Sequence, residues 1–310
     1  MKKKLDFSKP LIVLAPLAGY TDLPFRSVVK KFGADLTISE MISSNALVYK
    51  SARTLKMIEK SPAEDPYFVQ IAGNKPELVK EAVEILNDVE GIDGIDLNCG
   101  CPAPKVFNHG SGSNLLGDLK KLEEILSTIK KYSKKEYTSA KVRIGVNEKI
   151  PVDIGKVVEF CGADFVSVHG RTRAGKYKAP VDYDAIKELK ASVKIPVIAN
   201  GDIKDYQKAK EVLEYTKSDG VMIGRGSIGK PWIFYQLKHE LADIDNSIKK
   251  EIILEHYDKM LEYYGEYGAI IFRKLLHAYS KGYTGANEFR DLVNQISDTK
   301  VMRDLIEHFF

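Results

Sequence analysis

The sequence has few cysteines, little net charge and no long apolar run. Three cysteines in 310 residues exclude a disulfide-built scaffold and fit a reducing compartment such as the cytosol. The net charge of +4 is too small to indicate nucleic acid or a membrane by itself. Since no apolar run approaches the roughly 18 residues of a membrane span, we expect no membrane segment. These limits leave a globular chain, long enough for one large domain, either alone or with a small second one.

The first residues, MKKKLDFSKPLIVLAPLAG, join lysines to an apolar run and could therefore be a signal peptide. However, Asp6 stands among the lysines, and Pro16 interrupts the apolar run. The stretch LIVLAPLA also has the character of a buried strand. We therefore expect a strand here, no signal peptide and a cytoplasmic protein.

Eight β-rich runs recur along the chain, and several are apolar at both odd and even positions, as strands buried on both faces are. Helical segments separate them; in 76–89, for example, Leu78, Val79 and Leu86 share one face. Eight β-then-α units predict an α/β fold of the (β/α)8 TIM barrel type, and an open doubly wound sheet is the alternative. The runs are LIVLAP (11–16), DLTISE (35–40), YFVQIA (67–72), GIDLNC (94–99), AKVRIG (140–145), FVSVHG (165–170), PVIANG (196–201) and GVMIGR (220–225).

After residue 238 the strand-like runs stop. Residues 239–310 have helical patterning, interrupted at Gly265–Gly268 and at GYTG (282–285), so we predict three or four helices. We therefore predict two domains, a barrel over 1–238 and a helical domain over 239–310. Residues 238–310 hold 10 basic and 13 acidic residues, so the second domain is not a uniformly basic arm.

Polar or glycine-rich residues stand at the carboxyl end of every predicted strand, where barrels carry out their chemistry. Singly, each has a structural reading: Gln70 could bond loop backbone, Lys141 could lie at a strand edge, and His169 could be a core histidine. Together, an amide, a thiol, an amine and an imidazole at one mouth favour a functional site. The candidates are Pro16, Leu17, Ala18, Gly19, Glu40, Met41, Gln70, Asn98, Cys99, Cys101, Lys141, Arg143, His169, Asn200, Gly201, Asp202, Gly224 and Arg225.

The last two strand ends are glycine-rich: NGDI (200–203) and IGRG (223–226). Backbone amides at a helix start bind phosphate, and barrels place phosphate after strands seven and eight. Two ordinary tight turns are the alternative. A phosphate here, with Gln70, Lys141 and His169 around a planar ring, suggests flavin mononucleotide (FMN), since a lysine beside the pyrimidine edge of a flavin stabilises the anionic reduced ring.

Two of the three cysteines, Cys99 and Cys101, lie in DLNCGCPAPK (96–105). Neither a metal site nor a disulfide within CGC is expected, because zinc needs about four ligands and the disulfide ring would be strained. Strand alternation puts Asp96 and Asn98 on one face and Cys99 on the other. Cys101 opens an 18-residue loop (101–118) with hinge candidates at Gly110 and Gly112. Cys101 is therefore the candidate for chemistry, and Cys99 and Cys161 are expected in packing.

Several motifs, in order and at barrel spacing, resemble the tRNA dihydrouridine synthases, most closely their bacterial B-type branch. Cys99 departs from the pattern, in which methionine or alanine is expected, and the loop after Arg143 is short. The segment FRKLLHAYSKGYTGANEFRDLVNQI (272–296) resembles that family's helical RNA-binding domain. The barrel motifs are APLAGYTDLPFR (15–26), SEM (39–41), VQIAGN (69–74), DLNCGCPAPKV (96–106), KVRIG (141–145), VHGRTR (168–173), IPVIANGDI (195–203) and GRGSIGKPWIF (224–234).

The resemblance implies an enzyme that binds FMN and is reduced by NADPH, or by NADH. Reduced flavin then passes a hydride to carbon 6 of a uracil in tRNA, and a cysteine gives a proton to carbon 5. Cys101 matches the proton donor, and Asn98 matches a uracil contact. The target base has to leave its stack to reach the flavin. The matched FMN contacts are Pro16, Leu17, Ala18, Gln70, Lys141, His169, Asn200, Gly201, Asp202, Gly224 and Arg225.

Four basic residues stand out in the acidic second domain: Arg273, Lys274, Lys281 and Arg290, with only Glu288 between them. We predict that they contact tRNA; a solvated helix face is the alternative. No membrane and no obligate protein partner is implied. Two other functions stay open from the sequence: an FMN barrel acting on a small molecule, and a non-catalytic RNA-binding module. Neither the uridine position nor the oligomeric state can be read from the sequence.

Overall fold

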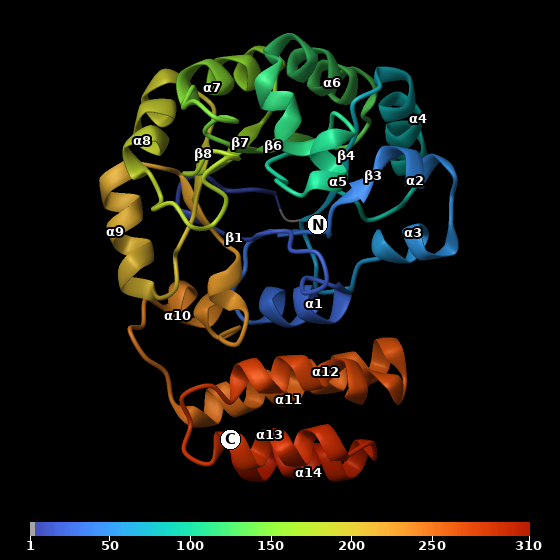
Figure 1. Ribbon diagram of the computed structural model, residues 1–310, viewed down its shortest axis with the longest axis vertical. Helices are drawn as coiled ribbons and strands as arrows, with labels where there is room; N and C mark the ends of the chain where they lie inside the picture. The colour runs from blue at the N-terminus through green and yellow to red at the C-terminus, as the bar shows by residue number, and fades with distance from the viewer. Residues whose placement is uncertain (1–3) are drawn as a thin grey trace.

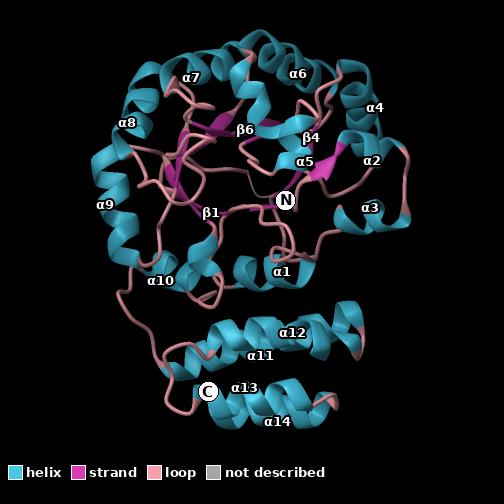
Figure 2. Cartoon of the chain, in the orientation of Figure 1, coloured by secondary structure: helices cyan, strands magenta, loops and turns pink. Residues whose placement is uncertain are grey.

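The computed structural model describes residues 4–310 of the chain. Residues 1–3, which belong to the segment considered as a signal peptide, lie outside the described part. The chain forms a ring of helices around a central parallel sheet, with a second group of helices beside the ring (Figure 1). Figure 2 shows the strands enclosed by the ring and only helices and loops in the second group.

The strands form one parallel sheet that closes on itself as a barrel. Its order is β1-β9-β8-β7-β6-β5-β4-β2, and β3 pairs with the end of β4. Between β1 and β2 closure is completed by a bridge from Val13 to Leu36. The strands are β1 (Leu11–Leu14), β2 (Thr37–Ile38), β3 (Ile42–Ser43), β4 (Tyr67–Ala72), β5 (Gly94–Cys99), β6 (Tyr137–Arg143), β7 (Phe165–His169), β8 (Val197–Asn200) and β9 (Gly220–Ile223).

The helices cover the outside of the barrel and make up the second group. Aspartate side chains cap several helix starts; Asp118 accepts from the Lys121 amide, and Asp205 accepts from the Lys208 amide. The barrel helices are α1 (Leu23–Lys31), α2 (Ser44–Val48), α3 (Ala52–Met57), α4 (Pro76–Asn87), α5 (Pro104–Asn108), α6 (Leu119–Tyr132), α7 (Pro151–Phe160), α8 (Tyr183–Ser192), α9 (Tyr206–Thr216) and α10 (Ile233–His239), with 3-10 turns η1 (Gly112–Gly117) and η2 (Arg225–Ser227). The second group holds α11 (Asn246–Tyr264), α12 (Tyr267–Tyr279), α13 (Ala286–Gln295) and α14 (Thr299–Phe309).

The barrel interior changes from apolar to polar along the strands. Near the strand starts, the ring of Phe68 lies 5.8 Å from that of Phe165 and 5.7 Å from that of Tyr137. Gly94 makes room for this cluster, because a Cβ there would lie 2.5 Å from the Phe68 ring. Apolar packing therefore closes one end of the barrel, and the polar inward residues are left at the carboxyl ends of the strands.

The second group packs on α1 through a continuous apolar core. Val28 and Phe32 of α1 are buried in the same cluster as Ile253 and Phe272. At its edge, Lys31 forms an ion pair of 2.9 Å with Glu255. This shared core places the helical group against one side of the barrel, beside its mouth.

The barrel and the C-terminal helices confirm the predicted fold class. The open doubly wound sheet is wrong, because β1 pairs with β9 and closes the sheet. Gly265, with φ of 64°, ends α11, as the predicted helix break requires. The domain boundary at 238/239 is a proposal; it falls in the last turn of α10.

Two local expectations were wrong. β6 begins at Tyr137 rather than 140, because its first residues pair with Gly94 and Ile95 of β5 even though they are polar. Residues 101–118 do not form a bare loop, since they contain α5 and the turn η1. Gly112 has a φ of 63°, and a Cβ there would lie 3.0 Å from the carbonyl oxygen of Cys101. A glycine at this position therefore lets the backbone of η1 pack closely against the backbone of Cys101.

Candidate active site

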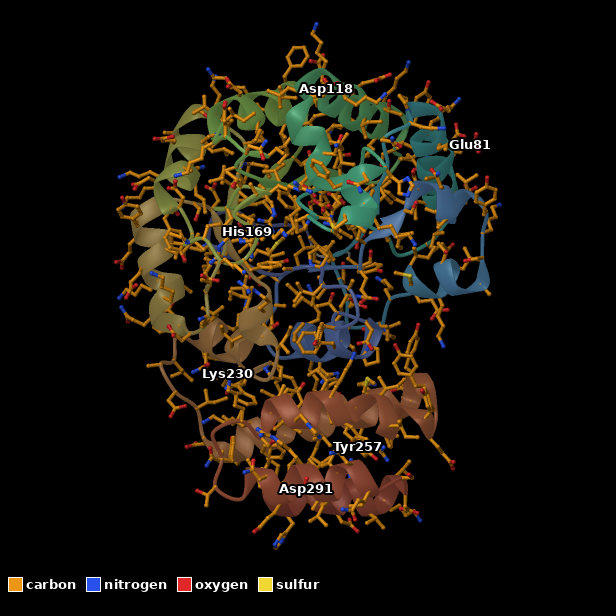
Figure 3. All side chains as sticks on the ribbon, viewed as in Figure 1. Glu81, Asp118, His169, Lys230, Tyr257 and Asp291 are labelled. Atoms are coloured by element: carbon orange, nitrogen blue, oxygen red, sulfur yellow. The ribbon has the colours of Figure 1, made fainter. Side chains whose placement is uncertain are left out.

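A cavity of about 1500 Å³ opens at the carboxyl ends of the strands and extends to the helical domain. In Figure 3, His169 lies within the ring of barrel helices, and Lys230 lies toward the second group. The cavity is lined by all eleven expected FMN contacts and by the expected substrate residues Asn98 and Lys281. With the expected proton donor Cys101, the predicted site residues that line it are Pro16, Leu17, Ala18, Gln70, Asn98, Cys101, Lys141, His169, Asn200, Gly201, Asp202, Gly224, Arg225 and Lys281.

Lys141 supplies a half-buried positive charge to the mouth of the barrel. Its Nζ donates to Oδ1 of Asn200 at 3.1 Å, and the other side of that amide donates to the Met222 carbonyl at 2.7 Å. Among the described residues, no carboxylate forms an ion pair with Lys141. Burial, helped by the charge of Arg143, lowers the pKa of Lys141 to about 8. An ammonium held in this way is ready to pair with an anionic group.

Arg171, on the segment after β7, organises the neighbouring side of the cavity. It forms an ion pair with Asp202 and donates to Nε2 of His169 at 3.3 Å. Because a guanidinium only donates, Nε2 accepts and the histidine proton sits on Nδ1. Burial, and then the nearby cations Lys141 and Arg143, lowers the pKa of His169, so the ring is neutral. The hydrogen bonds from Arg171 hold the pKa of Asp202 below its usual range.

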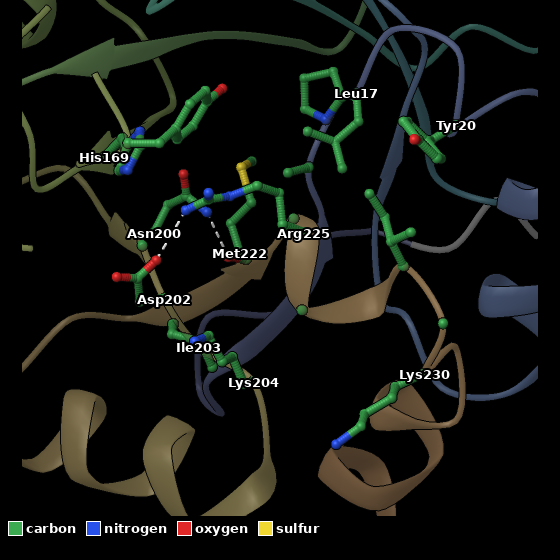
Figure 4. A pocket seen from close by; sticks show the side chains of 18 of the residues that line it. Leu17, Tyr20, His169, Asn200, Asp202, Ile203, Lys204, Met222, Arg225 and Lys230 are labelled. Carbon is green, nitrogen blue, oxygen red and sulfur yellow. Dashed lines mark hydrogen bonds and ion pairs between the residues drawn. The ribbon is translucent and has the colours of Figure 1, made fainter. Parts of the chain in front are cut away.

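The two glycine-rich loops meet at the edge of this cavity. A Cβ on Gly226 would lie 2.2 Å from the carbonyl oxygen of Ile203, and one on Gly201 would lie 2.8 Å from Val181. Arg225 reaches across and donates to Asp202 at 3.0 Å (Figure 4). The closely packed loop backbone and the Arg225 guanidinium are donors suited to a phosphate. The partly buried ammonium of Lys141 is suited to an electron-rich ring.

Cys101 stands over the mouth and is held through its backbone. Its amide donates to Oδ1 of Asn98 at 2.9 Å, and its carbonyl accepts from the Ser113 hydroxyl at 2.8 Å. The side chain is half-buried and lines the cavity. The thiol is thus free to face a bound substrate while the backbone is fixed on both sides.

The other two cysteines lie in packing, as expected. Cys99 is fully buried in the core between the barrel and its helices, and burial raises the pKa of its thiol well above the ordinary value. Cys161 is buried in the same core, just after α7. Only Cys101 of the three is accessible from the cavity.

Sequence reasoning missed Tyr177 and Arg171 and placed Arg143 at the mouth without a specific role. Tyr177 lies with its ring 4.2 Å from the Arg225 guanidinium and 5.4 Å from that of Arg143. Arg143 donates to the carbonyls of Gly100 (2.8 Å) and Thr172 (3.0 Å), so it joins the segment before Cys101 to the loop that carries Tyr177. Arg171 belongs to the motif VHGRTR (168–173) and follows the end of β7 by two residues. Its charge at that place was the sequence signal that could have identified it as a site residue.

The four basic residues of the helical domain do not come together. Arg273 donates to the Ile296 carbonyl at 2.8 Å, and Arg290 donates to Ser280 at 3.0 Å, both inside the helical domain. Lys274 reaches the barrel, where it bonds the carbonyl of Gly19. Only Lys281 lines the cavity. A shared tRNA-binding role for all four stays a prediction, and Lys281 is the best placed.

Residues 4–310 contain neither a candidate metal site nor a candidate membrane span. No three His, Cys, Asp or Glu side chains are grouped so that they could hold a metal ion. No helix in this part of the chain has the length and apolar character needed to cross a membrane.

A closed parallel barrel with a cationic, amide-lined mouth has the organisation of a barrel enzyme. The model of one enzyme family, the dihydrouridine synthases, matches residues 13–310. The chain therefore belongs to the dihydrouridine synthase family, which confirms the resemblance and the expectation of an oxidoreductase.

Curated relatives match over nearly the whole chain. A probable tRNA-dihydrouridine synthase of Helicobacter pylori (strain ATCC 700392 / 26695) is 53% identical over 308 residues, covering 99% of this chain and 94% of that one. A probable tRNA-dihydrouridine synthase of Rickettsia bellii is 42% identical, covering 96% and 94%. The tRNA-dihydrouridine synthase B of Vibrio parahaemolyticus is 38% identical, covering 96% and 95%.

Solved structures share the fold at much lower identity. An old yellow enzyme homologue from Zymomonas mobilis superposes with a TM-score of 0.53 at 13% identity, covering 77% of this chain and 91% of that one. Histamine dehydrogenase from Rhizobium sp. 4-9 gives 0.55 at 11% identity, covering 80% and 48%. These likenesses support the barrel fold.

Proposed function

We propose that this chain reduces uridines in tRNA to 5,6-dihydrouridine, using FMN and a nicotinamide reductant. The supporting observation is a cavity that combines a cationic cradle with an accessible thiol, in a chain that belongs to the dihydrouridine synthase family. The tRNA-dihydrouridine synthase names of relatives up to 53% identical over 99% of this chain support the same substrate.

The residues around the cavity fit FMN. Arg225 and the two glycine-rich loops are the candidates for its phosphate, and Lys141 is the candidate for the electron-rich edge of the ring. Pro16, Leu17 and Ala18 offer an apolar and backbone wall on the same cavity. When bound, FMN would supply the hydride for carbon 6 of the uracil ring, with NADPH or NADH as the source of its electrons.

Cys101 would hold the proton that goes to carbon 5 of the uracil. A thiol in water has a pKa of about 8.5 and is mostly protonated near neutral pH, so a cysteine can serve as an acid. The backbone contacts of Cys101 with Asn98 and Ser113 would keep the thiol at the mouth. The Asn98 side chain lies beside it and is the candidate for orienting the uracil.

The extension of the cavity toward the helical domain supports a long polyanionic substrate. Lys230, Lys249 and Lys281 line this part, and Asp243 is the acidic residue among them. A target base extruded from tRNA would enter the barrel while its neighbouring phosphates lie along these lysines.

Lys281→Gln should weaken tRNA binding and flatten its salt dependence. Lys281 is exposed on the cavity, and losing one phosphate contact lowers the slope of log affinity against log salt by about one. Binding is measured by fluorescence anisotropy at several salt concentrations. The matched control is Lys300→Gln, since Lys300 is exposed on α14 and does not line the cavity. Equal slopes for the two variants would move the RNA surface elsewhere.

The purified protein should be yellow and carry FMN without a covalent bond. Its visible absorption spectrum and the mass of the cofactor released by heat check this. The reason is the donor set around Lys141, Asn200 and Arg225. A colourless protein that cannot be reconstituted with added FMN would rule out the proposed function.

A further inference from the structure

Asp96 is a fully buried carboxylate inside the barrel, two residues before Asn98 on the same face of β5. Its Oδ2 accepts from Nε2 of Gln70 at 2.7 Å, and its Oδ1 accepts from the Ser139 hydroxyl at 2.6 Å. Within the described residues it forms no ion pair. Burial raises the pKa of Asp96 to about 6, against the opposing effect of these bonds. Its place inside the barrel is therefore not explained by electrostatic stabilisation of the fold.

The hydrogen bonds of Asp96 set the donor-to-acceptor direction of a series of hydrogen bonds that ends at Cys101. A carboxylate only accepts, so the Gln70 amide must turn its nitrogen toward Asp96. Oε1 of Gln70 is then left to accept from Nδ2 of Asn98 at 2.7 Å. Oδ1 of Asn98 in turn accepts from the amides of Gly100 at 3.2 Å and Cys101 at 2.9 Å. A flip of either side-chain amide would bring like atoms together, so one carboxylate fixes both.

We propose that Asp96 is a positioning residue: through Gln70 and Asn98 it fixes the backbone of Cys101, and with it the thiol, over the mouth of the barrel. This rests on the proposed function, in which Cys101 gives a proton to the substrate. Without an acceptor at position 96, Gln70 and Asn98 can rotate, and the Gly100–Cys101 segment loses its fixed partner. Displacement of a reacting group by about 1 Å can cost roughly 100-fold in rate.

The test compares Asp96→Leu with the conservative Asp96→Asn and with Ser139→Ala. Asparagine can still accept from Gln70 with its oxygen and donate to Ser139 with its nitrogen, so it should preserve the series of hydrogen bonds to Cys101. Ser139→Ala removes the other bond of the same carboxylate and leaves the Gln70 link intact. Asp96→Ser, too short to reach Gln70, replaces the leucine variant if that one does not fold.

Two readouts separate positioning from a general structural role. In the FMN-loaded protein at saturating tRNA, reoxidation of the reduced flavin should slow roughly 10- to 100-fold in Asp96→Leu. Reduction by NADPH should slow clearly less, since Gln70 is only one of the expected FMN contacts, and the affinity for tRNA should stay within about threefold. Alkylation of Cys101 by iodoacetamide, followed by mass spectrometry without tRNA, should change severalfold in rate. Asp96→Asn and Ser139→Ala should match the wild type in both.

A wild-type alkylation rate in Asp96→Leu would overturn the inference, as would equal slowing of both flavin half-reactions. Alkylation does not depend on any reaction with tRNA. It therefore tests the positioning of Cys101 even if the wild-type protein forms no dihydrouridine, a result that would contradict the proposed function itself.

Discussion

Cys101→Ala is expected to keep its flavin and its reduction by NADPH, yet to form dihydrouridine in tRNA roughly 10²- to 10⁴-fold more slowly. The thiol lines the cavity, whereas its backbone, not its side chain, makes the contacts with Asn98 and Ser113. Truncation should therefore remove the proton donor without moving the loop. Single-turnover oxidation of the reduced flavin by tRNA measures the effect directly.

Cys99→Ala is the matched control, because it removes the same atom two residues away. Cys99 is fully buried and separated from the cavity, so its loss should lower the melting temperature and leave flavin oxidation by tRNA nearly unchanged. If Cys99→Ala stalls while Cys101→Ala turns over normally, the two thiols have been assigned the wrong way round.

Lys141→Ala is expected to weaken FMN binding by roughly 10- to 100-fold, the range for losing a hydrogen bond to a charged group. Its ammonium is a half-buried cation in the mouth, and among the described residues Asn200 is its one hydrogen-bond acceptor. Titration of the FMN-free protein with FMN measures the affinity. Lys187→Ala is the control, since Lys187 is exposed on α8 with its ammonium over Tyr215. Equal affinities in the two variants would contradict the role of Lys141.

The pH dependence gives a second readout for Lys141. Its pKa is lowered to about 8, so the ammonium is charged below that pH and loses its proton above it. FMN affinity should therefore fall as pH rises through about 8. Arg143, whose charge helps to lower the pKa of Lys141, stays charged over this range. The step should be absent in Lys141→Ala, and a step that persists there would belong to another group.

The sequence could place the candidate residues on one cavity because a barrel has a simple geometry. Once the eight strands are located, their carboxyl ends have to converge, and so Gln70, Lys141, His169 and Asn200 could be placed on one cavity. Strand alternation also predicted that Asp96 and Asn98 share one face of β5 and that Cys99 lies on the other face, in packing. In the structure Cys99 is fully buried.

Side-chain networks were beyond the sequence, because they depend on rotamers and on loops from different strands. The contact of Tyr177 with Arg225 joins residues 48 positions apart through a loop without a regular period. Asp96 was placed on the inner face but without a partner, since its bonds run to β4 and β6. The inward contacts of Arg273 and Arg290 likewise require the packing of α12 against its neighbours, which charge counting cannot reveal.

The most direct test of the account is to incubate the FMN-loaded protein and NADPH with tRNA lacking dihydrouridine, and to analyse the nucleosides by mass spectrometry. The account predicts that specific uridines gain two hydrogens and that the reduced flavin is reoxidised in step with this gain. Flavin that is reoxidised by small acceptors while the tRNA uridines stay unchanged would contradict it.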